Sequence, residues 1–324
     1  MPSRRVVLAV LIALGTAPDT VLHSAPPTET PDWTITVTPQ PFDEAQVGPF
    51  TVTGRWVLTG NDWRFGGLSA LVPLGEHAFL AASDTGMMAR FAVDPVRPTE
   101  GLLMQPGGDE ARTKFGADIE ALARDPASGT LWAAYEWGGR VERFGPDLQP
   151  EASIVPPQMA DWSGNTGPES FARLPGGRFL AIEEVPRVLH DTRHRTVLFD
   201  GDPIEQPRGR DVLIEEIGDY RLVDAAALDD ETVLLLLRRF GFRPWPTFDT
   251  AIAAVRIDAL STQDVVTPFV LAEFGEAIFR ENYEGIAVTQ SNAGPVVWLI
   301  SDDNFASLQS TILLRLEYES GPER

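Results

Sequence analysis

The chain has 324 residues, of which 43% are hydrophobic, and it contains no cysteine. This length and composition allow a substantial core, whereas disulfide bonds, thiolate metal sites and a cysteine nucleophile are excluded. With 26 Lys plus Arg against 47 Asp plus Glu, the formal net charge is -21, which repels nucleic acid and anionic lipid and favours cations. We therefore expect no nucleic-acid partner.

The N-terminus has the pattern of a secretory signal. Arg4 and Arg5 precede an apolar run from Val6 to Leu14 that is too short to span a membrane. We predict a signal peptide over residues 1–25 and a periplasmic or extracellular mature protein, with an uncleaved N-terminal anchor as the alternative. Residues 26–49 are predicted to be a Pro-rich segment, and the mature chain is expected to have no membrane span and to be a monomer.

Similar segments recur along the rest of the chain. Five of them align by eye and each opens a unit: "FGGLSALV" from Phe65, "DIEALARD" from Asp118, "GPESFARL" from Gly167, "RLVDAAAL" from Arg221 and "NYEGIAVT" from Asn282. A turn rich in Gly, Pro, Asp or Asn follows each segment, then a second and a third apolar run, and in four units a fourth. Short strands repeated in this way are typical of β-propeller blades.

The sequence thus predicts an all-β fold, a single β-propeller domain over residues 50–324 with five four-stranded blades. The fifth unit lacks a fourth strand, and "FTVTGRWVLTG" (Phe50 to Gly60) is expected to fill that place and close the ring, which removes an exposed edge. Six blades is the alternative if "WTITVTPQ" (Trp33 to Gln40) and the longer connections hide another. An open β-sandwich is the main structural rival.

Acidic residues recur at two places in these units. Because the first and second strands of a blade are antiparallel, the start of the first lies at the same mouth as the end of the second. The first place holds Gly66, Glu120, Glu169, Asp224 and Glu284, and the second holds Asp84, Glu136, Glu184, Arg239 and Asp302. We expect these side chains to converge at one mouth of the channel.

Carboxylates crowded at one mouth repel one another, and a bound cation relieves that repulsion. Oxygen ligands without cysteine suit a hard cation such as Ca²⁺. The predicted metal ligands are Glu120, Glu169, Asp224, Glu284 and Asp84. The alternative is that these carboxylates accept hydrogen bonds from turn N–H groups or pair with arginine.

Two arginines interrupt the acidic pattern in "LLLLRRF", where Arg238 and Arg239 stand near the expected carboxylate. An arginine beside a metal can clamp a phosphate or a carboxylate. Arg238, Arg239 and Asn304 are therefore predicted to bind substrate. A salt bridge to a neighbouring acidic residue is the alternative role for either arginine.

The motifs "FGGLSAL", "GPESFARLPGGRFLAIEE", "LLLLRRF" and "NYEGIAV…WLISDDNF" resemble those of the phytase-like family, which has esterase-like activity. The resemblance covers roughly Phe50 to Tyr318. It implies an exported β-propeller distantly similar to calcium-dependent propeller phytases, which hydrolyse phosphomonoesters at a metal-filled channel mouth. A highly phosphorylated ring such as phytate needs several basic side chains, and this acidic face has few.

The sequence therefore predicts an exported, Ca²⁺-dependent hydrolase that acts on a small-molecule ester or phosphoester. Asp302 or Asp303 is expected to act as the base and Arg239 to stabilise the developing anion. The alternative function is a non-catalytic propeller that binds a small ligand or a protein partner and in which any metal is structural.

Overall fold

The computed structural model describes residues 33–107, 118–162, 167–183, 193–242, 246–275, 281–306 and 309–319. The predicted signal peptide lies outside these residues. In the described part of the chain, no helix has the length and apolarity to cross a membrane.

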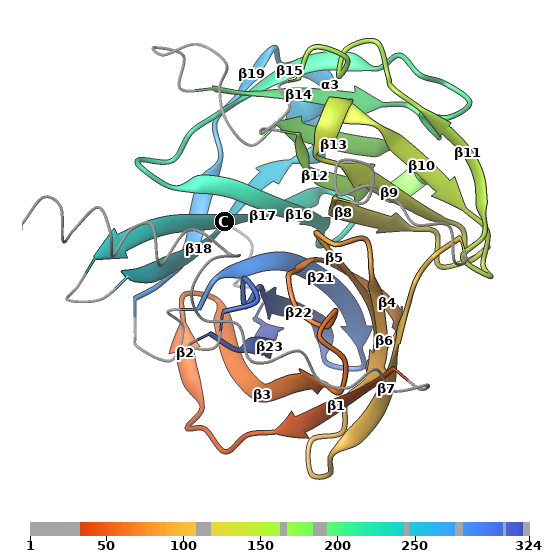
Figure 1. Cartoon of the computed structure of the whole chain (residues 1–324). Coiled ribbons are helices and arrows are strands. Elements are labelled where there is room, and N and C mark those ends of the chain that lie inside the picture. Colours follow the sequence, from red (N-terminus) through yellow and green to blue (C-terminus); the bar gives the residue numbers. More distant parts are fainter. Residues whose placement is uncertain are drawn as a thin grey trace, which may run out of the picture.

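The strands form antiparallel units that follow one another along the chain (Figure 1). Unit 1 contains β4 (Leu68–Gly75), β5 (Ala78–Ser83), β6 (Met88–Ala92) and β7 (Thr99–Met104). Unit 2 contains β8 (Ile119–Arg124), β9 (Leu131–Tyr135), β10 (Val141–Phe144) and β11 (Pro150–Ile154). Unit 3 contains β12 (Pro168–Arg173), β13 (Phe179–Glu183), β14 (Arg193–Phe199) and β15 (Arg210–Glu215).

Unit 4 contains β16 (Arg221–Ala227), β17 (Thr232–Phe242), β18 (Pro246–Arg256) and β20 (Phe269–Phe274). Unit 5 contains β21 (Tyr283–Ser291), β22 (Gly294–Ser301), β23 (Thr311–Tyr318) and, from the other end of the chain, β3 (Phe50–Gly60). The pairing of β3 with β23 confirms the predicted place of the N-terminal strand. The short helices are η1 (Trp137–Gly139), η2 (Pro175–Gly177) and α3 (Ile257–Thr262), and β19 (Val265–Val266) pairs in parallel with β15.

Strand β1 (Thr34–Pro39) joins units 5 and 1 at their outer edges, because it is antiparallel to both β3 and β7. The short β2 (Ala45–Val47) forms a hairpin with β3. Trp33 to Gln40, which the sequence left open as part of a sixth blade, therefore contributes a strand to this continuous sheet. Strand pairing begins at Thr34, before the expected domain start at Phe50.

The first strands of the units contact one another in a closed cycle, β4 to β8, β12, β16, β21 and back to β4. Figure 1 shows outer strands such as β7, β11 and β15 at the periphery. The described chain is thus an all-β, propeller-like ring. The first strands line its centre, and their starting ends share one mouth of the central channel.

The hydrophobic core is divided into clusters, and each cluster lies between two neighbouring units. In β17, Val233, Leu235 and Leu237 pack toward unit 3, whereas Leu234 and Leu236 pack toward unit 5. Successive side chains of a strand point to opposite faces, so a strand buried on both faces needs a continuous apolar run. This explains the "VLLLL" sequence.

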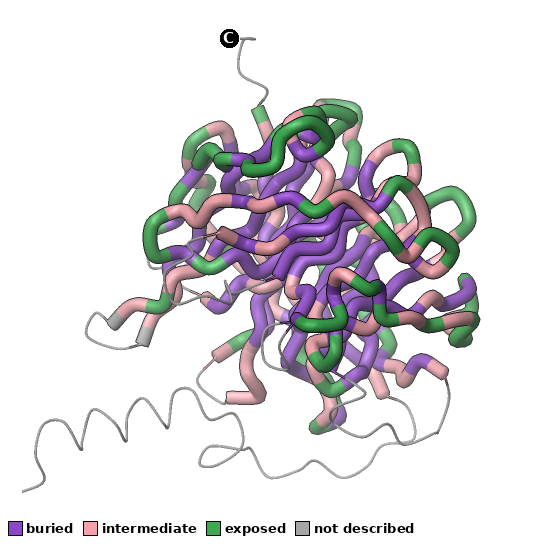
Figure 2. Tube along the Cα trace, turned by 90° about the horizontal axis from the view of Figure 1, so that it is seen from above, coloured by how far each residue is buried: buried purple, intermediate pink, exposed green. Residues whose placement is uncertain are grey.

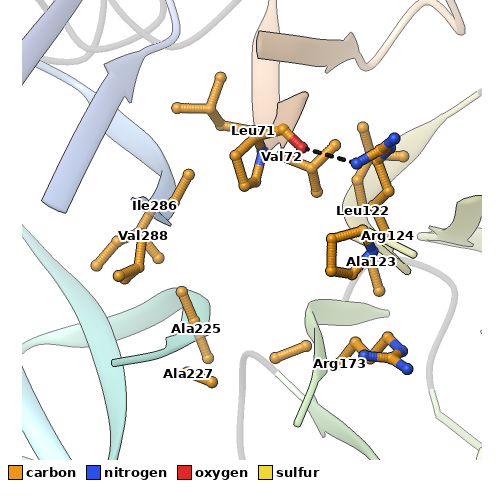
Figure 3. Close-up of a pocket in the computed structure, with 15 residues that line it drawn as sticks. Leu71, Val72, Leu122, Ala123, Arg124, Arg173, Ala225, Ala227, Ile286 and Val288 are labelled. Carbon is orange, nitrogen blue, oxygen red and sulfur yellow. Dashed lines mark hydrogen bonds between the residues drawn. The ribbon is translucent and has the colours of Figure 1, made fainter. Parts of the chain in front are cut away.

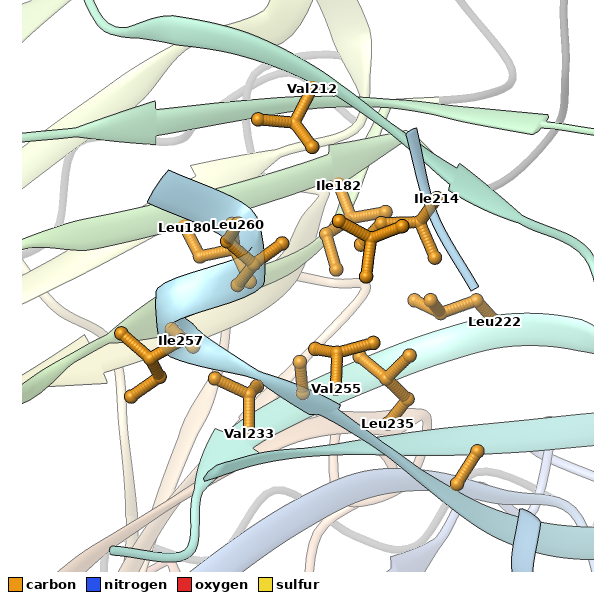
Figure 4. Packing of buried hydrophobic residues seen from close by; sticks show 14 of the residues in the cluster. Leu180, Ile182, Val212, Ile214, Leu222, Val233, Leu235, Val255, Ile257 and Leu260 are labelled. Carbon is orange, nitrogen blue, oxygen red and sulfur yellow. The ribbon is translucent and has the colours of Figure 1, made fainter. Parts of the chain in front are cut away.

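The cluster between units 3 and 4 is closed at its outer side by α3, whose Ile257 and Leu260 are buried against both units (Figure 4). Burial of each such aliphatic side chain contributes roughly 1.5–3 kcal/mol. Figure 2 shows the buried segments running through the strands and the exposed segments at the turns. This packing fixes the strands on which the candidate site is built.

Candidate active site at the acidic mouth

Three acidic residues of the first strands stand at β-bulges. In unit 2, Ile119 pairs with Tyr135 and Ala121 pairs with the next residue, Ala134, so Glu120 is the extra residue. Glu169 is the extra residue in unit 3 and Glu284 in unit 5. A bulge re-aims its side chain and commonly lies beside an active site. The three glutamates therefore share a structural reason for their position at the mouth.

The register shows that the alignment by eye was wrong in the other two units. The extra residue is Ser69 in unit 1 rather than Gly66, and it is Val223 in unit 4 rather than Asp224. Ser69 Oγ donates to the carbonyl oxygen of Ile119 at 2.7 Å. Units 1 and 4 thus contribute no carboxylate at this level of the mouth.

Asp224, one of the predicted metal ligands, is buried between β16 and β21. Its Oδ1 accepts the N–H of Ala225 at 2.8 Å, and its Oδ2 accepts the N–H of Ile286 at 2.8 Å. Burial raises the pKa of Asp224 well above its usual range, although both hydrogen bonds oppose that shift. The carboxyl group of Asp224 therefore links unit 4 to unit 5.

The second strands end in the other set of mouth residues. Ser83, Tyr135, Leu237 and Ser301 occupy equivalent places in the register. The residues that follow them are Asp84, Glu136, Arg238 and Asp302. Arg238, and not Arg239 as expected from the sequence, is therefore the equivalent of the carboxylates. Glu184, which belongs to the same set, lies outside the described residues.

Asp118, Glu120 and Glu136 form a carboxylate triad. One oxygen from each lies within 4.8 Å of the others, and Asp118 is buried. The N–H of Glu136 donates to the carbonyl oxygen of Asp118 at 3.2 Å, which ties the two strand ends together. The pKa of Glu120 is raised well above its usual range by burial and by the charges of Glu169, Asp118, Glu136 and Asp84, in that order. Such a group favours a proton or a cation.

The sequence placed Glu136 at the mouth but not among the predicted ligands, and it placed Asp118 in neither set. Asp118 precedes β8 and Glu136 follows β9, so both lie just beyond a pair of adjacent strand ends. The signal that identifies them is the antiparallel pairing of those strands.

Asp84 and Asp302 form a second acidic group at the same mouth. Burial and the charge of Asp84 raise the pKa of Asp302 to about 8, in spite of the hydrogen bond that the N–H of Asn304 donates to Asp302 at 2.6 Å. The charge of Asp303 raises this pKa further, and Arg238 lowers it. The carboxyl of Asp302 therefore carries a proton at neutral pH, which a crowded pair of carboxylates can exchange with a substrate.

Arg238 lies at this mouth, opposite Arg221 at the start of β16. Its Nη1 donates to Asn282 Oδ1 at 2.6 Å and also to Glu284 Oε1. Asn282 Nδ2 donates to Glu284 Oε1 at 2.9 Å and to Asp302 Oδ2 at 3.5 Å. Arg238, Asn282 and Glu284 therefore link unit 4 to Asp302.

Arg239 points to the other face of β17, as alternation along a strand requires. It forms ion pairs with Asp249 at 2.9 Å and with Asp219 at 3.2 Å, and its guanidinium lies 4.5 Å from the centre of the Tyr220 ring. Hydrogen bonds to these two aspartates raise the pKa of Arg239 further. The structure thus gives Arg239 carboxylate partners outside the mouth group.

Asp303 and Asn304 organise the loop after β22. Asp303 Oδ1 accepts the N–H groups of Gly67 at 3.1 Å and Phe305 at 3.0 Å, and its Oδ2 accepts the hydroxyl of Thr311 at 2.9 Å. Asn304 has a φ of +50°, and its Nδ2 donates to Gln309 at 2.7 Å. These contacts give Asp303 a positioning role between units 1 and 5.

A propeller-like all-β ring with a carboxylate-lined mouth is thus the class of protein that this fold and this site define. The chain belongs to the phytase-like family, described as esterase-like activity of phytase, which it matches over residues 63–305. This range includes the whole acidic mouth. No curated protein matches the chain.

Several solved structures are similar in outline. The major allergen Mala s 1 of Malassezia sympodialis is 10% identical with a TM-score of 0.43, and the match covers 87% of this chain and 95% of the allergen. U3-55K is 7% identical with a TM-score of 0.43, over 78% of this chain and 96% of its own. Hydrazine synthase of Kuenenia stuttgartiensis is 11% identical with a TM-score of 0.41, over 83% of this chain and 84% of its own.

Proposed function

We propose that the protein is a metal-dependent hydrolase that cleaves an ester or phosphoester bond of a small molecule at the acidic mouth. The observation that carries this proposal is the placement of the Asp118–Glu120–Glu136 triad beside the Asp84–Asp302 pair. The first group suits a cation and the second holds an exchangeable proton. Family membership supports the hydrolase class.

The triad fits a hard divalent cation such as Ca²⁺. All three donors are carboxylates, their oxygens lie within 4.8 Å of one another, and burial and neighbouring charges already raise the pKa of Glu120. Asp118, Glu120 and Glu136 would hold the ion, with Glu169 beside Glu120. A bound ion of this kind polarises a substrate oxygen and lowers the pKa of a coordinated water.

The chain's own residues supply the proton and the orientation. Because its pKa is raised to about 8, Asp302 holds a proton at neutral pH and can donate it to the oxygen of the leaving group. Asp84 and Asp302 together form the acid–base pair. Arg238, held by Asn282 and Glu284, places a positive charge at the mouth for an anionic substrate oxygen. Asp303 holds Gly67 and the loop after β22 in place.

The charge of the mouth restricts the substrate. The carboxylates described above outnumber the guanidinium groups of Arg238 and Arg221, so each additional phosphate group on a substrate would meet like charge. This favours a substrate with one ester or phosphoester group over a polyphosphorylated one such as phytate.

We further propose that the five units are five propeller blades, which the cyclic contacts of their first strands support. We also propose that the protein is exported, with cleavage after a signal peptide over residues 1–25. The mature protein is proposed to be a monomer. N-terminal sequencing of protein recovered from the periplasm or medium tests the export step.

The proposed activity is tested by incubating the purified protein with p-nitrophenyl phosphate, bis-p-nitrophenyl phosphate and p-nitrophenyl acetate, in EDTA and after addition of Ca²⁺ or Mg²⁺. Turnover of at least one substrate that depends on the cation supports the hydrolase. A cation-dependent rise of the melting temperature without turnover of a broader ester panel would contradict it and favour the non-catalytic propeller.

A further inference from the structure

The channel contains a cavity at the end opposite the acidic mouth. Its volume is about 150 Å³, and all five first strands contribute to its lining. The lining comes from residues that follow the bulge in each strand, as Leu122, Ala227 and Val288 illustrate (Figure 3). On β8, Glu120 and Arg124 are four residues apart, which corresponds to roughly 13 Å along a strand. The cavity is therefore distinct from the acidic mouth.

Two arginines line this cavity at the ends of neighbouring first strands. Arg124 Nη1 donates to the carbonyl oxygen of Pro73 at 3.3 Å, the interaction dashed in Figure 3. Within the part of the chain that the structure describes, Arg124 has no carboxylate partner at ion-pair distance. Arg124 is half-buried, so its guanidinium is only partly shielded from solvent at this end of the channel.

Arg173 shares its counter-charge with a neighbouring turn. Its Nη2 lies 3.4 Å from Asp125 Oδ1. That carboxylate also accepts the N–H of Ala127 at 3.1 Å and the hydroxyl of Ser128 at 2.9 Å. Burial raises the pKa of Asp125, but these hydrogen bonds and the charge of Arg173 lower it by more, so the net shift is downward. Asp125 is thus shared between Arg173 and its own turn. A guanidinium has five N–H donors, so this one contact leaves Arg173 able to donate to another acceptor.

The remaining walls are apolar. Figure 3 shows Val72, Leu122 and Ile286 around the space. Ala172 also lines it, and none of these side chains has a hydrogen-bond acceptor. The cavity exceeds several-fold the ~10–15 Å³ that one ordered water needs, and it is smaller than the roughly 300–1,000 Å³ of drug-sized pockets. This size, the apolar walls and the two guanidinium groups suit an occupant that is small, partly apolar and negatively charged.

We infer that this cavity binds a small organic carboxylate, whose carboxylate group contacts Arg124 and Arg173 and whose short hydrocarbon part fills the apolar walls. The inference stands independently of hydrolysis at the acidic mouth, because it uses different residues at the other end of the channel.

Isothermal titration of the purified protein with sodium butyrate tests the inference, with butyramide, acetate and inorganic phosphate as comparison ligands. We expect butyrate to bind several-fold more tightly than acetate and butyramide not to bind. Arg124→Gln and Arg173→Gln should each weaken butyrate binding by roughly tenfold or more, because each removes a charge-assisted hydrogen bond. Ala226→Leu should abolish binding by filling the cavity.

The matched control is Arg256→Gln, an exposed arginine at the end of β18 that pairs with Asp258 and Glu231. It should bind butyrate as the wild type does. Circular dichroism and the melting temperature show whether each variant folds, and the two cavity arginines provide independent tests. Equal binding of butyramide and butyrate, equal binding of phosphate and butyrate, or unchanged affinity in both arginine variants would overturn the inference.

Discussion

Arg238 of unit 4 and Glu284 of unit 5 form an ion pair across the boundary between two units, and Asn282 hydrogen-bonds to both. Glu284 stands at the bulge of a first strand, and Arg238 follows the end of a second strand. The pair therefore joins a bulge residue of a first strand to a residue that follows a second strand. Arg239, one residue later, pairs with Asp249 and Asp219 instead.

Replacement of the two arginines separates their roles. Arg238→Gln should lower kcat/KM by roughly a hundredfold, because the substrate oxygen loses its cationic donor. Arg239→Gln should leave kcat/KM unchanged and lower the free energy of unfolding by about 1 kcal/mol, because it removes partly exposed ion pairs. Steady-state kinetics and urea unfolding of both variants provide the comparison. Equal losses of activity in the two variants would refute the assignment of Arg238 to the mouth.

A second prediction concerns Gly67, which lies against Asp84. Gly67 has a φ of +60°, and a Cβ atom there would lie 2.3 Å from Asp84 Oδ1 and 2.6 Å from the ring of Phe305. Gly67→Ala should therefore displace the Asp84 side chain and lower kcat, in addition to a backbone cost of roughly 1–2 kcal/mol. Activity assays and urea unfolding measure the two effects.

Gly218→Ala is the matched control for that experiment. Gly218 has a φ of +59°, and no atom lies within 4 Å of an added Cβ. It should show a similar loss of unfolding free energy with normal kcat. If both alanine variants keep full activity, the contact between Gly67 and Asp84 has no part in the reaction.

A third prediction concerns pH and Asp302, whose pKa is raised to about 8 in the folded state from an ordinary value of 3.8. Between about pH 4 and 8 the folded protein keeps this proton and the unfolded chain releases it. The stabilising contribution is therefore fully present below pH 4 and is lost as the pH rises to about 8. The slope from one such group is at most ~1.4 kcal/mol per pH unit.

Urea unfolding of the wild type and Asp302→Asn in EDTA, at intervals from pH 4 to 9, measures the contribution of Asp302 to the free energy of unfolding. The wild type should lose stability relative to the variant as the pH rises to about 8, and the difference should be constant above it. Wild-type hydrolysis should also decline as the pH rises through about 8, because the donor loses its proton. A difference in stability that is constant from pH 4 to 8 would refute the raised pKa.

Much of the fold was accessible from the sequence because each unit repeats the same order of apolar runs and turns. The pairing of Phe50–Gly60 with the last strand followed from a missing strand in the fifth unit. Glu120, Glu169 and Glu284 were placed at the mouth because they align in sequence and also share the bulge.

The rest of the site depends on strand register. Register is a property of two paired strands, so the sequence of one strand does not reveal it. In unit 4 the bulge falls on Val223, so Asp224 is one residue beyond it and is directed to the backbone of β21. The same register brings Arg238 and not Arg239 to the mouth. A shift of one residue reverses the face of every side chain in a strand, so an alignment by eye that is wrong by one residue changes the site.

The most direct test of the acidic mouth is the cation-dependent hydrolysis of p-nitrophenyl esters by Glu120→Gln beside Glu100→Gln. Glu120 belongs to the carboxylate triad, whereas Glu100 is an exposed residue of β7. The account predicts that Glu120→Gln loses both the rise of melting temperature with Ca²⁺ and the cation-dependent turnover, while Glu100→Gln keeps both. Cation-dependent turnover at the wild-type rate in a folded Glu120→Gln variant would contradict it.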